Sequence, residues 1–363
     1  MDVQSTINTI MIIILGTAGL ALFGIVFGLF YKGIDRKISA HMQGRIGPPL
    51  VQPFRDVRKL FTKENIVPEN AVPWVFHMAP LIGLVGAISI LLYLPIVPQP
   101  DGGLAPLVTF GGDMILILYL LIIPSLALVI GGFASGSPYA TVGAQREMAT
   151  MIAYEFPLAI IIITLAWKLG STTSGGLGLT NAFAISTITA NPVWHVSGPF
   201  AFIGFIILLI VLVIVTPAEL SKIPFDSPEA ETEIGGGLLV EYSGRNLAMF
   251  YLMDSVKTVV MASIIVALFF PYQLSPVIGV VGYPAAIIDF IFFLVKVLII
   301  IVFSVTLIRV AVARLKIDQI VYTYWVPLTL LALVGLIFIM WEGWTFSPDT
   351  LGWEPLFRML GLV

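Results

Sequence analysis

INTIMIIILGTAGLALFGIVFGLF (residues 7–30) runs for 24 residues without a charged side chain and limits the kinds of structure that this chain can adopt. About 20 apolar residues are enough for a helix to cross the hydrocarbon core of a bilayer. The run is too long for the core of a signal peptide and follows Asp2 rather than basic residues, so we expect it to remain as a membrane-spanning helix.

Seven similar apolar runs follow, at about 75–98, 112–133, 148–169, 199–217, 247–270, 286–309 and 321–341. The 363 residues are 58% hydrophobic and 11% charged, and their mean hydropathy is +1.03, whereas about a quarter of a soluble domain is charged. These values exclude an ordinary soluble protein. We predict an all-α polytopic membrane protein, with about eight transmembrane helices forming a single domain over residues 1–363.

The basic residues gather in four connecting loops, at about 32–74, 134–147, 218–245 and 310–320, which together with Arg309 at the edge of the last hold 14 of the 18 lysines and arginines. Short cytoplasmic loops carry an excess of Lys and Arg. We therefore expect these loops to be cytoplasmic, both termini to be outside, and the chain to lie in the plasma membrane.

The chain has no cysteine, which excludes a disulfide and an all-cysteine iron–sulfur cluster. His41, His77 and His195 are far apart and follow no metal-ligand spacing. No phosphate-binding loop, dinucleotide fingerprint or serine-hydrolase motif occurs in the sequence. We expect no cofactor in this chain, no nucleic-acid partner and no independent catalysis, with any redox centre on a partner protein.

The third cytoplasmic loop holds six of the 21 carboxylates within 23 residues: Glu219, Asp226, Glu229, Glu231, Glu233 and Glu241. Crowding and burial both raise carboxyl pKa values, so this loop could hold and relay protons near neutral pH. A solvated acidic loop is the alternative. The apolar stretch 234–240 and three nearby prolines favour the relay, because a merely solvated loop would be more polar.

Glu147 and Glu155 belong to the fourth span, whose interior also contains Pro157. Ionisable groups inside a membrane are costly and are functional candidates by default. The two glutamates are eight residues apart, about 12 Å along a helix and close to one face, so water or another side chain must bridge them.

Two other spans carry a pair of opposite charges. Asp254 and Lys257 are three residues apart in the sixth span, where they could neutralise each other or belong to an ion route. Asp289 and Lys296 are two turns apart in the seventh span, so we expect each to find its partner on another helix.

The first cytoplasmic loop contains a segment whose apolar residues recur at helical spacing and alternate with charged ones: Phe54, Val57, Leu60 and Phe61. This pattern predicts an amphipathic helix on the membrane surface. It could touch anionic lipid, dock a soluble partner or form the wall of a substrate entrance.

Three strings carry a family resemblance: GRIGPPLVQPFRDVRKLF at 44–61, GSPYATVGAQREMATMIAYE at 136–155 and AELSKIPFDSPEAETEIGGGLLVEYSG at 218–244. The sequence resembles the membrane-anchor subunit of energy-converting, membrane-bound nickel–iron hydrogenases and formate hydrogenlyases, which is homologous to the quinone-site membrane subunit of respiratory complex I. The PEAE and EYSG strings, the string ARLKID at 313–318 and the in-span lysines are similar to the hydrogenase branch. Sulfur-reducing relatives share all of these strings.

The resemblance implies a subunit without its own redox centre that couples electron transfer to H⁺ or Na⁺ translocation. Implied partners are iron–sulfur and hydrogenase-like large subunits on the cytoplasmic side, which hold iron–sulfur clusters and, in the hydrogenase branch, a nickel–iron centre, together with antiporter-like membrane subunits. By motif position, Glu147, Glu155 and the six loop carboxylates belong to the ion route. Residues implied to face the soluble arm are Arg45, Arg55, Asp56, Arg58 and Lys59.

Three other functions stay open: a quinone-site subunit of an NADH or ferredoxin:quinone oxidoreductase, a stand-alone ion transporter, and a purely structural anchor. The acidic string departs from the complex I pattern, so we assign no quinone ligand. The lack of an internal repeat argues against the transporter, and the in-span charges argue against a passive anchor. The terminal acceptor is a proton, a sulfur compound or a quinone.

Overall fold

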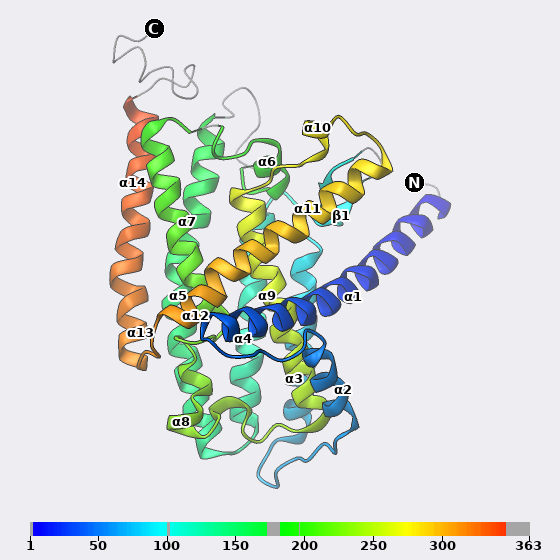
Figure 1. Cartoon of the computed structure of the whole chain (residues 1–363), viewed down its shortest axis with the longest axis vertical. Helices are drawn as coiled ribbons and strands as arrows, with labels where there is room; N and C mark the ends of the chain where they lie inside the picture. The colour runs from blue at the N-terminus through cyan, green and yellow to red at the C-terminus, as the bar shows by residue number, and fades with distance from the viewer. Residues whose placement is uncertain (1–2, 100–101, 173–181, 196, 346–363) are drawn as a thin grey trace.

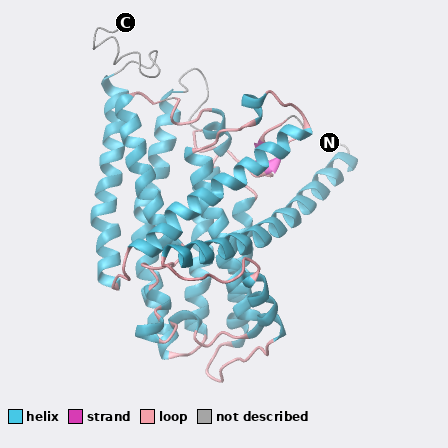
Figure 2. Cartoon of the chain, in the orientation of Figure 1, coloured by secondary structure: helices cyan, strands magenta, loops and turns pink. Residues whose placement is uncertain are grey.

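The computed structural model describes residues 3–99, 102–172, 182–195 and 197–345. Helices dominate this part of the chain (Figure 2), and strands β1 (Val97–Pro98) and β2 (Leu104–Ala105) form a small antiparallel pair. Eight helical segments among the described residues are long and apolar enough to cross a membrane. The predicted class, an all-α polytopic membrane protein, is therefore confirmed.

Six of these segments are single helices: α1 (Val3–Met42), α3 (Pro73–Leu91), α4 (Asp113–Ala134), α5 (Pro138–Thr172), α7 (Pro199–Glu219) and α9 (Gly244–Phe269). The seventh joins α11 (Tyr283–Ile301), the π-helical turn η4 (Val302–Thr306) and α12 (Leu307–Ala311). The eighth joins α13 (Ile317–Thr323), the π-helical turn η5 (Tyr324–Leu328) and α14 (Thr329–Thr345). Shorter elements are α2 (Gln52–Thr62), α6 (Ile185–Ala190), η2 (Ser227–Glu229), α8 (Glu231–Ile234), η3 (Gly237–Leu239) and α10 (Ser275–Ile278).

Helix α9 is the centre of the bundle, because 94% of its most apolar window is buried. It packs against α1, α3 and α11, while α14 packs against α7 and α5 (Figure 1). Small residues let the backbones approach, as is usual between helices in a membrane. At Gly28 of α1, a Cβ atom would lie 2.5 Å from the carbonyl oxygen of Ser255, so only glycine allows α1 to lie this close to α9.

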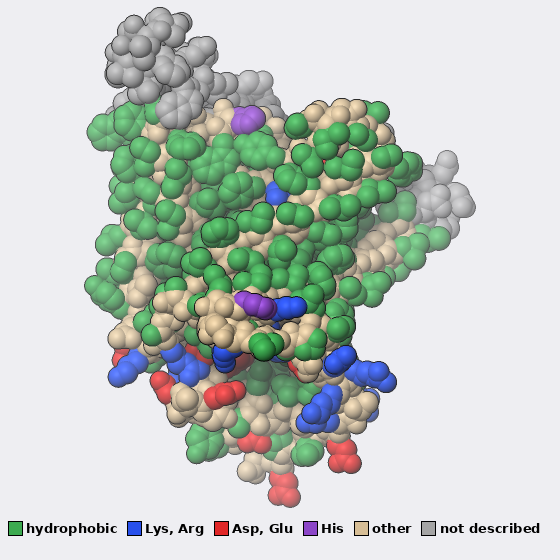
Figure 3. Space-filling view, viewed as in Figure 1, with side chains coloured by type: hydrophobic (Ala, Val, Ile, Leu, Met, Phe, Trp, Pro, Cys, Tyr) green, Lys and Arg blue, Asp and Glu red, His purple; other side chains and the backbone are tan. Residues whose placement is uncertain are grey.

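Charged side chains gather at one end of the molecule, next to a broad hydrophobic surface (Figure 3). Helices α2 and α8 lie at this end, and α6 and α10 lie at the other (Figure 1). The first turns of α1 and the last turns of α14 also lie toward the α6 and α10 end. The termini themselves, predicted to be outside, fall beyond the described residues, and the assignment of the charged end to the cytoplasm stays a prediction.

Parts of the predicted loops are helical. The segment expected to be loop from residue 32 continues α1 to Met42, because polar side chains of this extension find partners on neighbouring elements. The segment expected as loop 134–147 is helical from Pro138, where α5 begins after Gly136 turns the chain with a φ of 68°. Glu147 therefore lies inside a helix. Helix α13 likewise begins at Ile317, inside the expected loop 310–320.

The amphipathic surface helix is confirmed as α2, which buries Pro53 and Val57. It packs on α9 and α1, so its apolar side covers the charged end of both helices.

Candidate functional site

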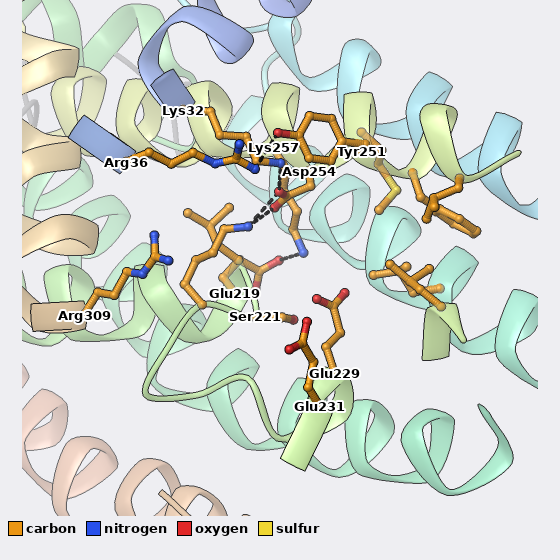
Figure 4. A pocket seen from close by; sticks show the side chains of 17 residues that line it. Lys32, Arg36, Glu219, Ser221, Glu229, Glu231, Tyr251, Asp254, Lys257 and Arg309 are labelled. Atoms are coloured by element: carbon orange, nitrogen blue, oxygen red, sulfur yellow. Dashed lines mark hydrogen bonds and ion pairs between the residues drawn. The ribbon is translucent and has the colours of Figure 1, made fainter. Parts of the chain in front are cut away.

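A cavity of about 460 Å³ opens at the charged end of the bundle, between α1, α9, α12 and the acidic loop 218–245 (Figure 4). Its polar lining residues are Lys32, Arg36, Glu219, Ser221, Lys222, Glu229, Glu231, Tyr251, Asp254, Lys257 and Arg309. Five of these were predicted as ion-route residues from the sequence. The structure brings those five together from three segments of the chain.

Asp254 occupies the centre of this cavity wall. Lys32 of α1 donates to its Oδ2 atom at 2.6 Å, and Lys222 of the acidic loop donates to both carboxylate oxygens at 2.7 Å. The Lys32 ammonium also lies 3.4 Å from the centre of the Tyr251 ring, a cation–π contact. Asp254 thus ties α9 to α1 and to the loop.

The salt bridge considered between Asp254 and Lys257 does not form. Lys257 instead lies 2.9 Å from Glu219, at the end of α7, and it donates to Ser125 of α4 at 2.7 Å. Glu219 is 2% exposed and Lys257 is 4% exposed, so this ion pair is deeply buried. The reason for the exchange is that Asp254 already has two lysine partners, whereas Glu219 would otherwise be an uncompensated buried charge.

The hydroxyl groups of Ser125 and Tyr154 lie 3.1 Å apart and extend the pair toward α5. Glu147, on the same helix as Tyr154, is 1% exposed and accepts a hydrogen bond from Ser221 at 3.3 Å. Glu155 is half-buried. Both glutamates interact electrostatically with the buried pair of Glu219 and Lys257.

One carboxylate oxygen of Glu147 and one of Glu155 is buried without a hydrogen-bond partner among the described residues. A buried carboxylate in this state is costly, whereas a protonated carboxyl or an ion held at the free oxygen removes the cost. Pro157, two residues beyond Glu155, has no N–H and therefore leaves the helical carbonyl of Ala153 without its usual donor.

The acidic loop folds into the short elements η2, α8 and η3. Glu229 and Glu231 point toward the cavity (Figure 4). Glu233 turns away and pairs with Arg146 of α5 at 2.5 Å. The chain is extended at Ala230, between η2 and α8, so neither a single helix nor a single strand describes the spacing of the three glutamates.

Two further loop carboxylates have different surroundings. Asp226 forms an ion pair with Arg314, which precedes α13, and this pair holds the loop against the eighth segment. Glu241 is half-buried and is not among the residues lining the cavity. Three of the six loop carboxylates therefore line the cavity, and two others form ion pairs that hold the loop in place. The cavity-lining residues are Glu219, Glu229 and Glu231, the paired residues are Asp226 and Glu233, and Glu241 does neither.

Burial raises the pKa of Glu229 above the ordinary carboxyl value, while the nearby Lys222 and Lys32 lower it and Asp254 raises it further. The ammonium groups therefore offset only part of the cost of its negative charge. We therefore expect Glu229 to bind a proton more readily than a solvated carboxyl group does as the pH falls.

Asp289 and Lys296 are not part of this cluster. Asp289 accepts hydrogen bonds from the backbone N–H groups of Leu274 and Ser275 and from the Ser275 hydroxyl, at 2.6 to 2.8 Å. Lys296 donates to the carbonyl oxygens of Phe270 and Tyr272. We expected each residue to pair with a charge on another helix, but both bind the segment that joins α9 to α11. Backbone groups of this segment need hydrogen-bond partners because helix α9 ends there.

Four of the five residues implied to dock a partner are exposed: Arg45, Arg55, Arg58 and Lys59. The fifth, Asp56, is half-buried and accepts a hydrogen bond from Arg36 at 2.9 Å. Its carboxylate fastens α2 to α1, and the expectation that Asp56 faces a soluble arm stays a prediction.

Sequence reasoning missed several polar residues that form ion pairs or hydrogen bonds inside the structure: Lys32, Asp35, Arg36, Lys168, Lys222, Tyr251, Arg309 and Glu342. The first three looked like charges of a soluble loop, although their spacing of three and four residues is helical and could have placed them on an extension of α1. Lys168 and Glu342 form a buried pair at 2.8 Å near the opposite end of the bundle. Nothing in their sequence positions, 174 residues apart, connects them.

Comparison with known proteins agrees with this architecture. The NADH dehydrogenase family matches residues 15–340. The H subunit of NADH-quinone oxidoreductase from Geobacillus sp. (strain WCH70) is 33% identical over 331 residues, covering 88% of this chain and 90% of that protein. The corresponding protein of Anoxybacillus flavithermus (strain DSM 21510 / WK1) is 33% identical over 346 residues, covering 92% and 95%.

A solved structure is also similar. A chain of the membrane-bound sulfane sulfur reductase, an archaeal respiratory membrane complex, superposes with a TM-score of 0.70 at 25% identity, covering 89% of this chain and 99% of that one. The bundle, its cavity and these similarities define a membrane component of a complex I-like assembly. Within that class, the chain belongs to the NADH dehydrogenase family and is a homologue of the H subunit of NADH-quinone oxidoreductase.

Proposed function

We propose that this chain anchors an electron-transfer arm on the membrane and couples electron transfer to the movement of H⁺ or Na⁺. The observation that carries the proposal is a set of charged groups that begins in the cavity and extends into the bundle. It runs from Asp254 with its two lysines, through the pair Glu219–Lys257, to Glu147 and Glu155.

The acidic loop is the element that we expect to transmit the coupling. Lys222 lies on this loop and supplies one of the two ammonium groups at Asp254, so a shift of the loop changes the charge balance at α9. The ion pairs of Arg146 with Glu233 and of Arg314 with Asp226 hold the present position. A redox event that stabilises another position would bias protonation of the buried carboxylates, and its effect is limited by the difference in free energy between the two positions.

The redox centres belong to partners in this proposal. Iron–sulfur subunits and a hydrogenase-like large subunit dock at the charged end through Arg45, Arg55, Arg58 and Lys59, and antiporter-like subunits lie beside the bundle in the membrane. The terminal acceptor is a proton in a nickel–iron hydrogenase or a sulfur compound in a related reductase. The similarity to a sulfane sulfur reductase chain supports such an assembly.

Replacement of Glu155 tests the coupling. In the purified complex reconstituted into liposomes, Glu155→Gln should lower ion uptake per electron severalfold, while electron transfer to a soluble dye stays close to wild type. The matched control is Glu69→Gln, which removes an exposed carboxylate from a loop. Full ion uptake in the Glu155 variant would remove this residue from the route.

A quinone-reducing complex is the second candidate, because the relatives at 33% identity are H subunits of NADH-quinone oxidoreductases. Parallel assays of hydrogen evolution, sulfur reduction and quinone reduction on one preparation distinguish the acceptors. Reduction of a quinone analogue alone would select this candidate. Isolation of the chain without partners, together with ion transport by the chain alone, would contradict both candidates.

A further inference from the structure

A second cavity, of about 500 Å³, lies at the charged end of α1 and shares Arg36 and Arg309 with the first. Its polar lining comes from Arg36 and Ser39 of α1, from Gln43 and Arg45 in the turn that follows, and from Arg309 of α12. The proposed function uses one residue of this lining, Arg45, as one of four that dock a partner, and assigns no ligand to the cavity itself. Three guanidinium groups on one cavity wall, without a carboxylate in the lining, mark a site for an anion.

Two of these arginines already pair with carboxylates that lie outside the cavity lining. Arg36 donates to Asp56 and to the Tyr251 hydroxyl, and Arg309 donates to Asp35 at 3.1 Å. Each guanidinium has five N–H donors, so both keep donors for a ligand. Three arginines against two carboxylates leave one positive charge, which fits one negative charge on the ligand.

The remaining carboxylates of this region belong to the neighbouring cavity. Asp226, Glu229 and Glu231 line a space of about 320 Å³ on the loop side, and Asp226 is held by Arg314. Arg45 is exposed, and its donation to the neutral side chain of Gln43 leaves its charge uncompensated. Arg45 is therefore the residue that carries the unbalanced charge.

Two of its arginines lie near the charged ends of apolar spans, Arg36 in Met11–Met42 and Arg309 in Tyr283–Ala311. Ile46 at its rim is fully exposed. The surface of the segment η4–α12 leading to Arg309 is also apolar, with Phe303 59% exposed and Leu307 41% exposed. An anion bound here has hydrocarbon on one side and water on the other, as a lipid headgroup does.

We propose that this cavity binds the phosphate of a glycerophospholipid with one net negative charge, such as phosphatidylglycerol. The phosphodiester oxygens accept hydrogen bonds from Arg36, Arg45 and Arg309, and the acyl chains lie along the apolar surface of Phe303 and Leu307. A basic pocket next to spanning helices is the arrangement that recognises anionic headgroups. The bound lipid joins the end of α1 to α12 from outside the bundle.

Native mass spectrometry of the purified complex tests the site. The complex is exchanged into detergent with phosphatidylglycerol or phosphatidylcholine, and the lipid retained by this chain is counted. We expect wild type to retain one phosphatidylglycerol in preference to phosphatidylcholine, and Arg45→Gln to weaken this retention at least about tenfold, the effect of losing one charge-assisted hydrogen bond. Arg245→Gln removes an exposed arginine elsewhere at the same end and should leave retention unchanged.

A second variant distinguishes loss of the lipid site from loss of the fold. Arg309→Lys keeps the charge opposite Asp35 but loses the planar fork, so the fold is kept while lipid retention falls. Equal retention of the two lipids, or unchanged retention in both variants, would overturn the proposal. Loss of the soluble subunits from the Arg45 variant with its phosphatidylglycerol still bound would also overturn it, and would assign the cavity to a protein partner.

Discussion

At the scale of single residues, the central finding is how one aspartate and one glutamate share three lysines. Asp254 takes Lys32 and Lys222, and Glu219 takes Lys257. The buried pair is weak evidence for stability by itself, since desolvation offsets most of its attraction, but removing one partner leaves a bare charge in the bundle.

We therefore expect Lys257→Met to lower the apparent free energy of unfolding of the complex by about 3–5 kcal/mol. The double variant Lys257→Met/Glu219→Gln should lose less than the single variant, because it removes the uncompensated carboxylate as well. Thermal denaturation followed by loss of the intact complex measures both, with Lys63→Met as the exposed-lysine control. A double variant less stable than the single one would show that Lys257 does not serve to neutralise Glu219.

The raised pKa of Glu229 gives a prediction about pH. A carboxyl that binds its proton more tightly in the folded loop than in an unfolded chain stabilises the fold at low pH. This contribution is lost as the pH rises from the ordinary carboxyl value, about 4.3, through the raised folded value. Glutamine has no proton to lose, so the stability of the Glu229→Gln variant should lack this contribution to the pH dependence.

Infrared difference spectra of wild type minus Glu229→Gln, recorded against pH, should show a protonated carboxyl band persisting above about pH 4.3. Glu231→Gln is the matched comparison, since Glu231 faces the same cavity but is exposed. A protonated carboxyl band that disappears near pH 4.3, the ordinary carboxyl pKa, would contradict the prediction that burial raises the pKa of Glu229.

At the scale of elements, the acidic loop depends on its glycines. Gly235, Gly236 and Gly237 all have positive φ, which side-chain-bearing residues rarely adopt. At Gly237 a Cβ atom would overlap the carbonyl oxygen of Pro228, whereas at Gly235 nothing lies within 4 Å. The two positions separate the cost of the backbone conformation from the cost of close packing.

Gly235→Ala should therefore cost about 1–2 kcal/mol, the penalty for an L-residue in the left-handed region. Gly237→Ala should cost clearly more and should release the loop from α5. Limited proteolysis between residues 226 and 241, compared for the two variants, reports the release. Equal protection of both variants would show that the contact with Pro228 does not hold the loop.

At the scale of the whole molecule, four loops that are far apart in the sequence meet at one end, and the basic residues predict that this end is cytoplasmic. The absence of native cysteine makes the test direct. In intact cells, a membrane-impermeant thiol reagent should label Ser186→Cys, in α6, and should label Lys63→Cys only in inside-out vesicles. The reverse pattern would overturn the predicted orientation.

The amino-acid sequence alone determined the spanning segments and the surface helix, because an apolar run of bilayer length and a helical hydrophobic period are local properties. It also indicated Glu147, Glu155 and the acidic loop, since a charge in an apolar run is conspicuous wherever the chain folds. It could not assign the partners of these charges. Only the tertiary structure decided that Lys257 pairs with Glu219, that Asp254 pairs with Lys32, and that Asp289 binds a backbone turn, because an ion pair forms with the nearest available group in space, whatever its separation in the sequence.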